Sequence, residues 1–126
     1  MVAGLLDTAV VVDLLRSFEP ASRWLADQRD ELGLSPVVWL EVLEGPENLR
    51  AQASAIELLR HFERVRVEPQ DFDWAIEHQI DHRLRHGVDM MDCLIAATSH
   101  RLGVPLFTRN LKHFKPLLGA QARRPY

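Results

Sequence analysis

Three acidic residues lie in sequence surroundings that are unusual for carboxylates. Asp7, Glu41 and Asp92 come from distant parts of the chain, and each lies within or directly beside a run of apolar residues. A carboxylate is costly to bury unless it is paired or bound to a metal. If the fold brings the three together, an all-oxygen donor set without a Cys/His cluster favours Mg²⁺ or Mn²⁺ over zinc. A cation held there would also attract a phosphate group.

Each of these acids also has a plainer interpretation. Asp7 follows an apolar run and precedes a helical pattern, so it could serve only as an N-cap. Asp89 and Asp92 stand three residues apart at a predicted helix start, where the helix dipole alone favours acids. Glu41 could face solvent on an amphipathic helix. Taken singly, each acid favours the plain interpretation, whereas the three together favour a shared cation.

The elements that must position these acids alternate along the chain. Short apolar runs predict four strands, at residues 2–6, 32–35, 65–67 and 104–107. Helical spacing, caps and Gly or Pro stops predict the intervening helices, at about 8–18, 19–31, 36–44, 47–64, 69–86 and 90–102. This alternation predicts an α/β fold with a short parallel β-sheet flanked by α-helices, in one domain over residues 1–126.

Polar residues follow the ends of these strands. Asp7 and Thr8 come directly after the first strand, and residues 108–110 come directly after the fourth. Glu41 lies on the helix after the second strand, and Asp92 lies in the first turn of the helix that precedes the fourth. Sites in open parallel sheets form beyond the carboxyl ends of the strands. We therefore expect these side chains to meet at one edge of the sheet.

Four segments of the sequence match a known pattern. In order, they are LLDT (5–8), SPVVWLEVLEG (35–45), DCLIAAT (92–98) and TRNLKHF (108–114). Together they resemble the signature blocks of PIN domains and, more narrowly, of the VapC-type toxins of prokaryotic toxin–antitoxin operons. The resemblance extends from about residue 4 to residue 118. It implies a single PIN-like ribonuclease domain. The implied activity is that of an Mg²⁺- or Mn²⁺-dependent endoribonuclease that cuts tRNA, rRNA or mRNA. By the same resemblance, the cut leaves 5′-phosphate and 3′-hydroxyl ends.

The resemblance also implies roles for individual residues. By motif position, Asp7 and Asp92 are expected to be direct metal ligands, and Glu41 a ligand or a base that positions water. All three are therefore the expected catalytic residues. Thr8 and Thr108 are expected to be supporting hydroxyls that orient a carboxylate or a water molecule.

The last block departs from the family pattern. Family members often carry a fourth acid at the position of Asn110 or His113, and neither is acidic here. Asn110 can still support a water molecule through its amide oxygen, but a tightly held second metal is in doubt. His113 is expected to be structural rather than a phosphate contact. Arg109, Lys112 and Lys115 are the candidates for binding the RNA backbone.

Charge and composition limit the remaining possibilities. The chain has 47% hydrophobic and 26% charged residues, a mixture typical of folded globular proteins. All 18 acids lie in the first 92 residues, which carry a net charge of −9, whereas the remainder carries +6. This asymmetry indicates either an anion-binding face or simply a basic chain end. The single cysteine, Cys93, excludes an internal disulfide scaffold.

The sequence and the resemblance together predict where the protein acts and with what. No apolar run approaches the ~20 residues of a membrane span, and no signal peptide is visible, so a cytoplasmic protein without membrane contact is expected. By resemblance, the partners are an RNA substrate, a second copy in a homodimer, and a cognate antitoxin whose peptide covers the acidic groove.

Two other functions compete with the ribonuclease. The missing fourth acid is compatible with a PIN-like module that binds RNA or protein without cutting. A phosphoacceptor receiver domain also places acids on an α/β sheet. It is disfavoured because no adjacent pair of acids follows a strand, and no lysine ends a late strand.

Overall fold

A computed structural model describes all 126 residues and contains one five-stranded sheet. All strand pairs are parallel, in the order β3-β2-β1-β4-β5. The strands are β1 (Gly4–Leu6), β2 (Leu32–Leu34), β3 (Glu63–Arg64), β4 (Leu106–Phe107) and β5 (Ala122–Arg123). The predicted α/β fold with a short parallel sheet is confirmed, and β1, which leads into Asp7, is the central strand.

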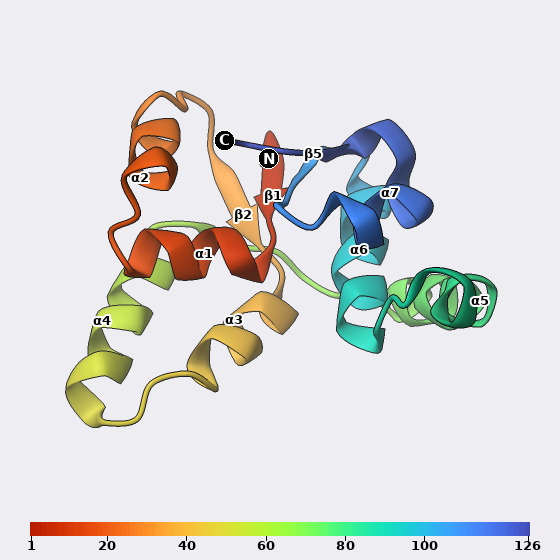
Figure 1. Cartoon of the computed structure of the whole chain (residues 1–126), viewed down its shortest axis with the longest axis horizontal. Helices are drawn as coiled ribbons and strands as arrows, with labels where there is room; N and C mark the ends of the chain where they lie inside the picture. The colour runs from red at the N-terminus through yellow and green to blue at the C-terminus, as the bar shows by residue number, and fades with distance from the viewer.

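Seven helices surround the strands. They are α1 (Thr8–Leu15), α2 (Glu19–Ala26), α3 (Pro36–Leu43), α4 (Leu49–Leu59), α5 (Pro69–His86), α6 (Met90–Leu102) and α7 (Leu111–Leu118). Figure 1 shows α1–α4 on one side of the strands and α5–α7 on the other. Helix α5 lies at the rim and packs most extensively against α6. None of the helices has both the length and the apolar character of a membrane span.

The strands form the centre of the hydrophobic core. Leu5 and Leu6 of β1 and Leu106 of β4 are fully buried, within a core of 25 residues that extends into the helices on both sides. Burial of both faces explains why these strands are continuous apolar runs without alternation. The core therefore fixes the strand ends from which the polar site residues project.

Three helices begin at side-chain N-caps that lie beyond the sheet edge. Asp7 caps α1, and Ser35 caps α3, whose first residue is Pro36. Asp89 caps α6 in a reciprocal capping box with Asp92. The N-cap interpretation of Asp7 is confirmed, and Asp89 lies at the predicted helix start as its N-cap. A capping role does not remove Asp7 from the site, because only one of its two oxygens faces the helix N-terminus.

Several element boundaries differ from the sequence prediction. The third strand is Glu63–Arg64 rather than 65–67, because these exposed edge residues pair with Gly33 and Leu34. Helix α2 ends at Ala26 rather than near residue 31, and α4 is shorter at both ends than predicted. Helix α7 and strand β5 were not predicted. β5 is a two-residue edge strand without an apolar run, so it leaves no periodic signal.

Candidate active site

Asp7 is the most buried acid at the carboxyl edge of the sheet. It is only 6% exposed, and each carboxylate oxygen accepts one hydrogen bond. Oδ1 accepts from the backbone N–H of Thr8 (2.8 Å), and Oδ2 accepts from the hydroxyl of Thr108 (2.8 Å). The Thr108 hydroxyl in turn accepts from the backbone N–H of Asn110 (2.9 Å). The loop after β4 therefore orients the acid that follows β1.

Glu41 is linked to Asp7 through hydrogen bonds of Thr8. The Thr8 hydroxyl donates to Glu41 Oε1 at 2.6 Å, which joins the start of α1 to the half-buried side chain on α3. Thr8 therefore contacts both acids, Asp7 through its backbone and Glu41 through its side chain. Both threonines that were predicted to support the carboxylates lie in hydrogen-bonding contact with them.

Asp92, in the first turn of α6, is the third carboxylate at this edge. Asp7, Glu41 and Asp92 are together called the acidic group below. Oδ2 of Asp92 accepts from the backbone N–H of Asp89 (3.2 Å) and lies 3.2 Å from Nδ1 of His113 on α7. The amide group of Asn110 lies 2.9 Å from the same imidazole nitrogen. His113, expected to be structural rather than a phosphate contact, thus lies beside Asp92 and Asn110.

The three carboxylates are electrostatically coupled. Burial, reinforced by the charges of Asp92 and Glu41, raises the pKa of Asp7 to about 6, against the lowering effect of its hydrogen bonds. Burial also raises the pKa of Glu41, and the carboxylates of Asp89 and Asp92 add to this effect. The pKa of Asp92 is raised by burial, while His113 lowers it in part. Three acids that disfavour one another's charge form a site that a cation would stabilise.

The candidate ligand atoms are oxygens, which hard divalent cations such as Mg²⁺ prefer. The candidate ligands are carboxylate oxygens, and hydroxyl groups hold two of the carboxylates in place. No three acidic, His or Cys side chains converge as a preassembled metal cage. Mg²⁺ does not require such a cage, because it usually keeps several waters and binds one or two carboxylates together with substrate phosphates. Asp7, Glu41 and Asp92 fit that mode of binding.

The raised pKa values predict how stability depends on pH without metal. A carboxylate whose pKa is raised on folding favours the folded state below its unfolded pKa and loses that contribution as pH rises through its folded pKa. For Asp7 the loss lies between about pH 4 and 6 and amounts to about 3 kcal/mol. Urea unfolding in chelator at pH 4.5 and 7.5 should show about 2 kcal/mol of this loss, because the rest has already occurred below pH 4.5. The variant Asp7→Asn cannot ionise and should lack this loss; an equal pH dependence in both proteins would contradict the assignment.

The predicted RNA-binding residues divide into two groups. Lys112 and Lys115 are exposed on α7. Arg109 instead donates from Nη1 to Asp13 Oδ2 (2.9 Å), and the hydroxyl of Tyr126 donates to the same oxygen (2.6 Å). Arg109 is nevertheless exposed, and its guanidinium helps to fix the chain end on α1. The roles of Arg109 and of the two lysines in RNA binding stay predictions.

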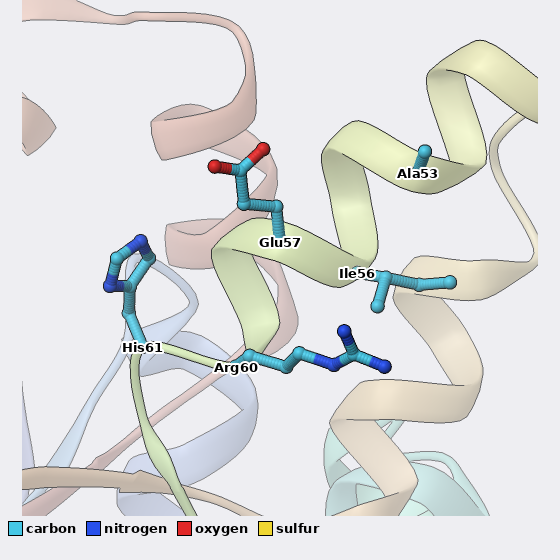
Figure 2. A pocket seen from close by; sticks show the side chains of 5 residues that line it. All are labelled: Ala53, Ile56, Glu57, Arg60 and His61. Carbon is cyan, nitrogen blue, oxygen red and sulfur yellow. The ribbon is translucent and has the colours of Figure 1, made fainter.

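A hollow of 590 Å³ lies elsewhere on the molecule, along α4 and the turn after it (Figure 2). It is lined by Ala53, Ile56, Glu57, Arg60 and His61, which project from the helix surface and the turn that follows it. Only Ile56 among these side chains is partly buried, and none belongs to the acidic group. The hollow therefore has no part in the candidate site.

Comparison with known proteins identifies a family and a set of similar folds. The PIN domain family matches residues 4–116 of the chain. No curated protein sequence matches it. The fold is similar to that of a toxin–antitoxin complex from Klebsiella pneumoniae, with a TM-score of 0.81 and 22% identity over 98% of both chains.

Two further structures share the fold. DNA-bound VapBC from Salmonella typhimurium has a TM-score of 0.76 and 21% identity, covering 94% of this chain and 95% of that one. VapC20 from Mycobacterium tuberculosis, a Sarcin–Ricin-loop-cleaving toxin, has a TM-score of 0.71 and 19% identity, covering 86% and 90%. At these identities the likeness shows a shared fold.

Proposed function

The chain belongs to the PIN domain family, and we propose that it is a Mg²⁺- or Mn²⁺-dependent endoribonuclease, the toxin of a toxin–antitoxin pair. The observation that carries this proposal is the acidic group at the carboxyl edge of the sheet. Asp7, Glu41 and Asp92 come from three separate parts of the chain, and burial there raises the pKa of each, with neighbouring carboxylates adding to the effect. The whole chain, residues 1–126, acts as one ribonuclease domain in this proposal.

The chain's own residues have distinct tasks in the proposed reaction. Asp7 and Asp92 are the ligands that hold the cation, and Glu41 either joins them or orients water for attack. Thr108 and Thr8 fix the carboxylates so that they need not reorganise when substrate binds. When bound, the cation supplies Lewis-acid chemistry, activating water and neutralising charge on the scissile phosphate.

RNA binding requires positive charge beside the acids. Lys112 and Lys115 on α7 are exposed and follow directly on the loop that holds Asp7. We propose that they bind backbone phosphates on the approach to the site. No Asp or Glu follows Asp92, so the C-terminal part of the chain keeps a net positive charge for this purpose.

Cleavage of a mixed pool of structured RNAs by purified protein tests the proposal. Discrete fragments are expected with Mg²⁺ or Mn²⁺, and none with chelator. The competing proposal is a PIN-like module that binds RNA or protein without cutting, which the lack of a fourth acid favours. RNA binding in a gel-shift assay without metal-dependent fragments would favour that module and contradict the nuclease.

An antitoxin partner is supported by the family and by the fold neighbours. Several of the similar structures are themselves toxin–antitoxin complexes. We propose that a cognate antitoxin neutralises this chain by covering the acidic group with a peptide segment. Such a segment would need basic side chains, because the uncovered site carries closely spaced carboxylates.

Helix α5 supports the proposal that the chain also forms a homodimer. Phe72, Ile76, Ile80 and Leu84 recur every fourth residue and form an exposed apolar stripe, with Ile80 76% exposed and Leu84 96% exposed. An apolar stripe of this kind marks an interaction surface. Two copies of α5 packed antiparallel about a twofold axis between Ile76 and Ile80 would place Phe72 of each copy against Leu84 of the other.

The charges beside the stripe match this arrangement. In the same antiparallel register, the exposed Asp73 of one copy would face the exposed Arg83 of the other, so one patch complements itself. The variant Ile80→Glu should therefore be monomeric where the wild type is dimeric by light scattering at micromolar concentration. Leu49→Glu, on an exposed position of α4, is the matched control. A monomeric wild type, or a dimeric Ile80→Glu, would contradict this interface.

A further inference from the structure

Three histidines recur every fourth residue along α5. His78, His82 and His86 form a row, called the histidine row below, and their neighbouring ring centroids lie 5.9 and 5.3 Å apart. The row is out of phase with the apolar stripe of α5 by two residues, or about 200°, so it faces the opposite side of the helix. Neither the acidic group nor the proposed dimer interface uses these imidazoles.

The spacing of the rings is close to what one shared cation requires. Zn²⁺ binds imidazole nitrogens at about 2.0–2.1 Å in tetrahedral geometry, so two rings on one ion have centroids about 5 Å apart. Zinc sites on helices place two histidines four residues apart for this reason. The rings of His78 and His82 are 5.9 Å apart and inclined by 25°, so they need to approach each other by only about 1 Å.

His78 is already held in the tautomer that a metal ligand needs. Its Nδ1 lies 2.8 Å from the backbone oxygen of Trp74, and its ring stacks on the Trp74 indole with a centroid distance of 3.6 Å. A carbonyl oxygen only accepts, so Nδ1 carries the hydrogen and Nε2 of the neutral ring keeps its lone pair. Histidines that bind metals donate their other ring nitrogen to a carbonyl or a carboxylate in this way.

His82 lies next in the row and has a nitrogen without a partner. Its Nδ1 is shielded from solvent and makes no hydrogen bond, a costly state that a bound cation would relieve. Burial, and then the charges of His86 and His78, lower the pKa of His82, so its ring is neutral at neutral pH. Asp81 adjoins His82, whereas Arg85 adjoins His86. These charges favour a cation between His78 and His82 over one between His82 and His86.

We propose that His78 and His82 bind a borderline divalent cation such as Zn²⁺, His78 through Nε2, with water as the remaining ligands. The ligands are nitrogens, in contrast to the oxygens of the acidic group, and the site does not depend on the proposed ribonuclease function. No third acidic, His or Cys side chain converges on the pair. The bound cation would join two successive turns of α5.

Isothermal titration calorimetry of the full chain with Zn²⁺, in excess Mg²⁺ to occupy oxygen ligands, tests the site. One ion per chain is expected. His78→Gln and His82→Gln should each weaken binding by more than about tenfold, because even the loss of a group that orients a ligand costs about 10–100-fold. His61→Gln, at an exposed position after α4, and Asp92→Asn, in the acidic group, should bind as the wild type does. Circular dichroism confirms that each variant is folded.

The identity of the ligand atoms has its own measurement. With Cu²⁺ in place of Zn²⁺, electron paramagnetic resonance should show coupling to two nitrogens in the wild type. His78→Gln and His82→Gln should each lose the two-nitrogen pattern. A wild-type spectrum with oxygen ligands alone would contradict the proposal.

Other results of the titration would overturn the site. No Zn²⁺ binding by the wild type, or equal affinity in the wild type and both glutamine variants, would do so. Loss of binding in Asp92→Asn alone would place the ion at the acidic group. Loss in His86→Gln with His78→Gln unaffected would place it one turn further along α5. None of these results bears on RNA cleavage, so failure of this site and failure of the proposed function are distinguishable.

Discussion

Replacing Asp7 by Asn should abolish RNA cleavage while leaving the protein folded. The substitution preserves the shape of the side chain but removes the charge of the most buried acid in the site, which two hydrogen bonds orient. Without that charge the cation is held poorly and the phosphate is not neutralised. We expect a loss on the order of 1,000-fold in cleavage rate, equivalent to about 4 kcal/mol of transition-state stabilisation.

The stability of the same variant separates function from folding. Because burial and neighbouring acids raise the pKa of Asp7 to about 6, the carboxylate that is present at neutral pH costs more free energy in the folded than in the unfolded protein. Asp7→Asn should therefore unfold at a higher urea concentration than the wild type at pH 7.5 in chelator. Asp30→Asn, at an exposed position, should change neither the cleavage rate nor the urea concentration at which the protein unfolds. An Asp7→Asn protein that keeps a tenth or more of wild-type cleavage would contradict the assignment.

Replacing Asp71 by Ala should have the largest effect on stability. Asp71 is 1% exposed at the start of α5 and accepts hydrogen bonds from Arg101 at Nε (2.9 Å) and Nη2 (3.2 Å). It also accepts from the hydroxyl of Thr98 (3.1 Å) and the backbone N–H of Glu68 (3.0 Å). Truncation removes the shared acceptor of these donors between α5 and α6, and only Arg101 Nη2 keeps another partner, the backbone oxygen of Arg66. We expect a loss of about 3 kcal/mol in the free energy of unfolding.

An exposed ion pair provides the matched comparison. Arg23 and Glu19 form an i, i+4 pair on α2 with both side chains largely exposed to solvent. Such pairs contribute less than about 1 kcal/mol, so Glu19→Ala should have little effect on urea unfolding. If Asp71→Ala were equally mild, the Asp71–Arg101 pair would not be the structural link between α5 and α6 that the contacts indicate.

The convergence of the acids could be predicted because it depends on topology. Parallel strands end at a common edge, so residues that directly follow β1 and β4 must lie close together whatever their side chains do. Asp7 and Thr108 are 101 residues apart in sequence and form a hydrogen bond there. Caps at Asp7 and Asp89 could also be predicted, since they depend on local sequence alone.

The side-chain partners could not be predicted in the same way. His113 contacts Asp92 only because α7 packs against α6, and α7 itself was not predicted. Arg109 pairs with Asp13, and Tyr126 joins them from the end of the chain. No local pattern relates residues separated by 96 and 113 positions. These contacts depend on how helices pack, which periodicity does not specify.

The chemical nature of the RNA ends tests the central claim most directly. If Asp7, Glu41 and Asp92 hold a cation that directs water at the phosphate, and the bond from phosphorus to the 3′ oxygen breaks, cleavage leaves a 5′-phosphate and a 3′-hydroxyl. Fragments made by purified protein with Mg²⁺ can be mapped by ligation that accepts only 5′-phosphate ends. We expect efficient ligation, and no fragments with chelator or with Asp7→Asn. Fragments with 2′,3′-cyclic phosphate ends that persist in chelator would show attack by the RNA 2′-hydroxyl and contradict the account.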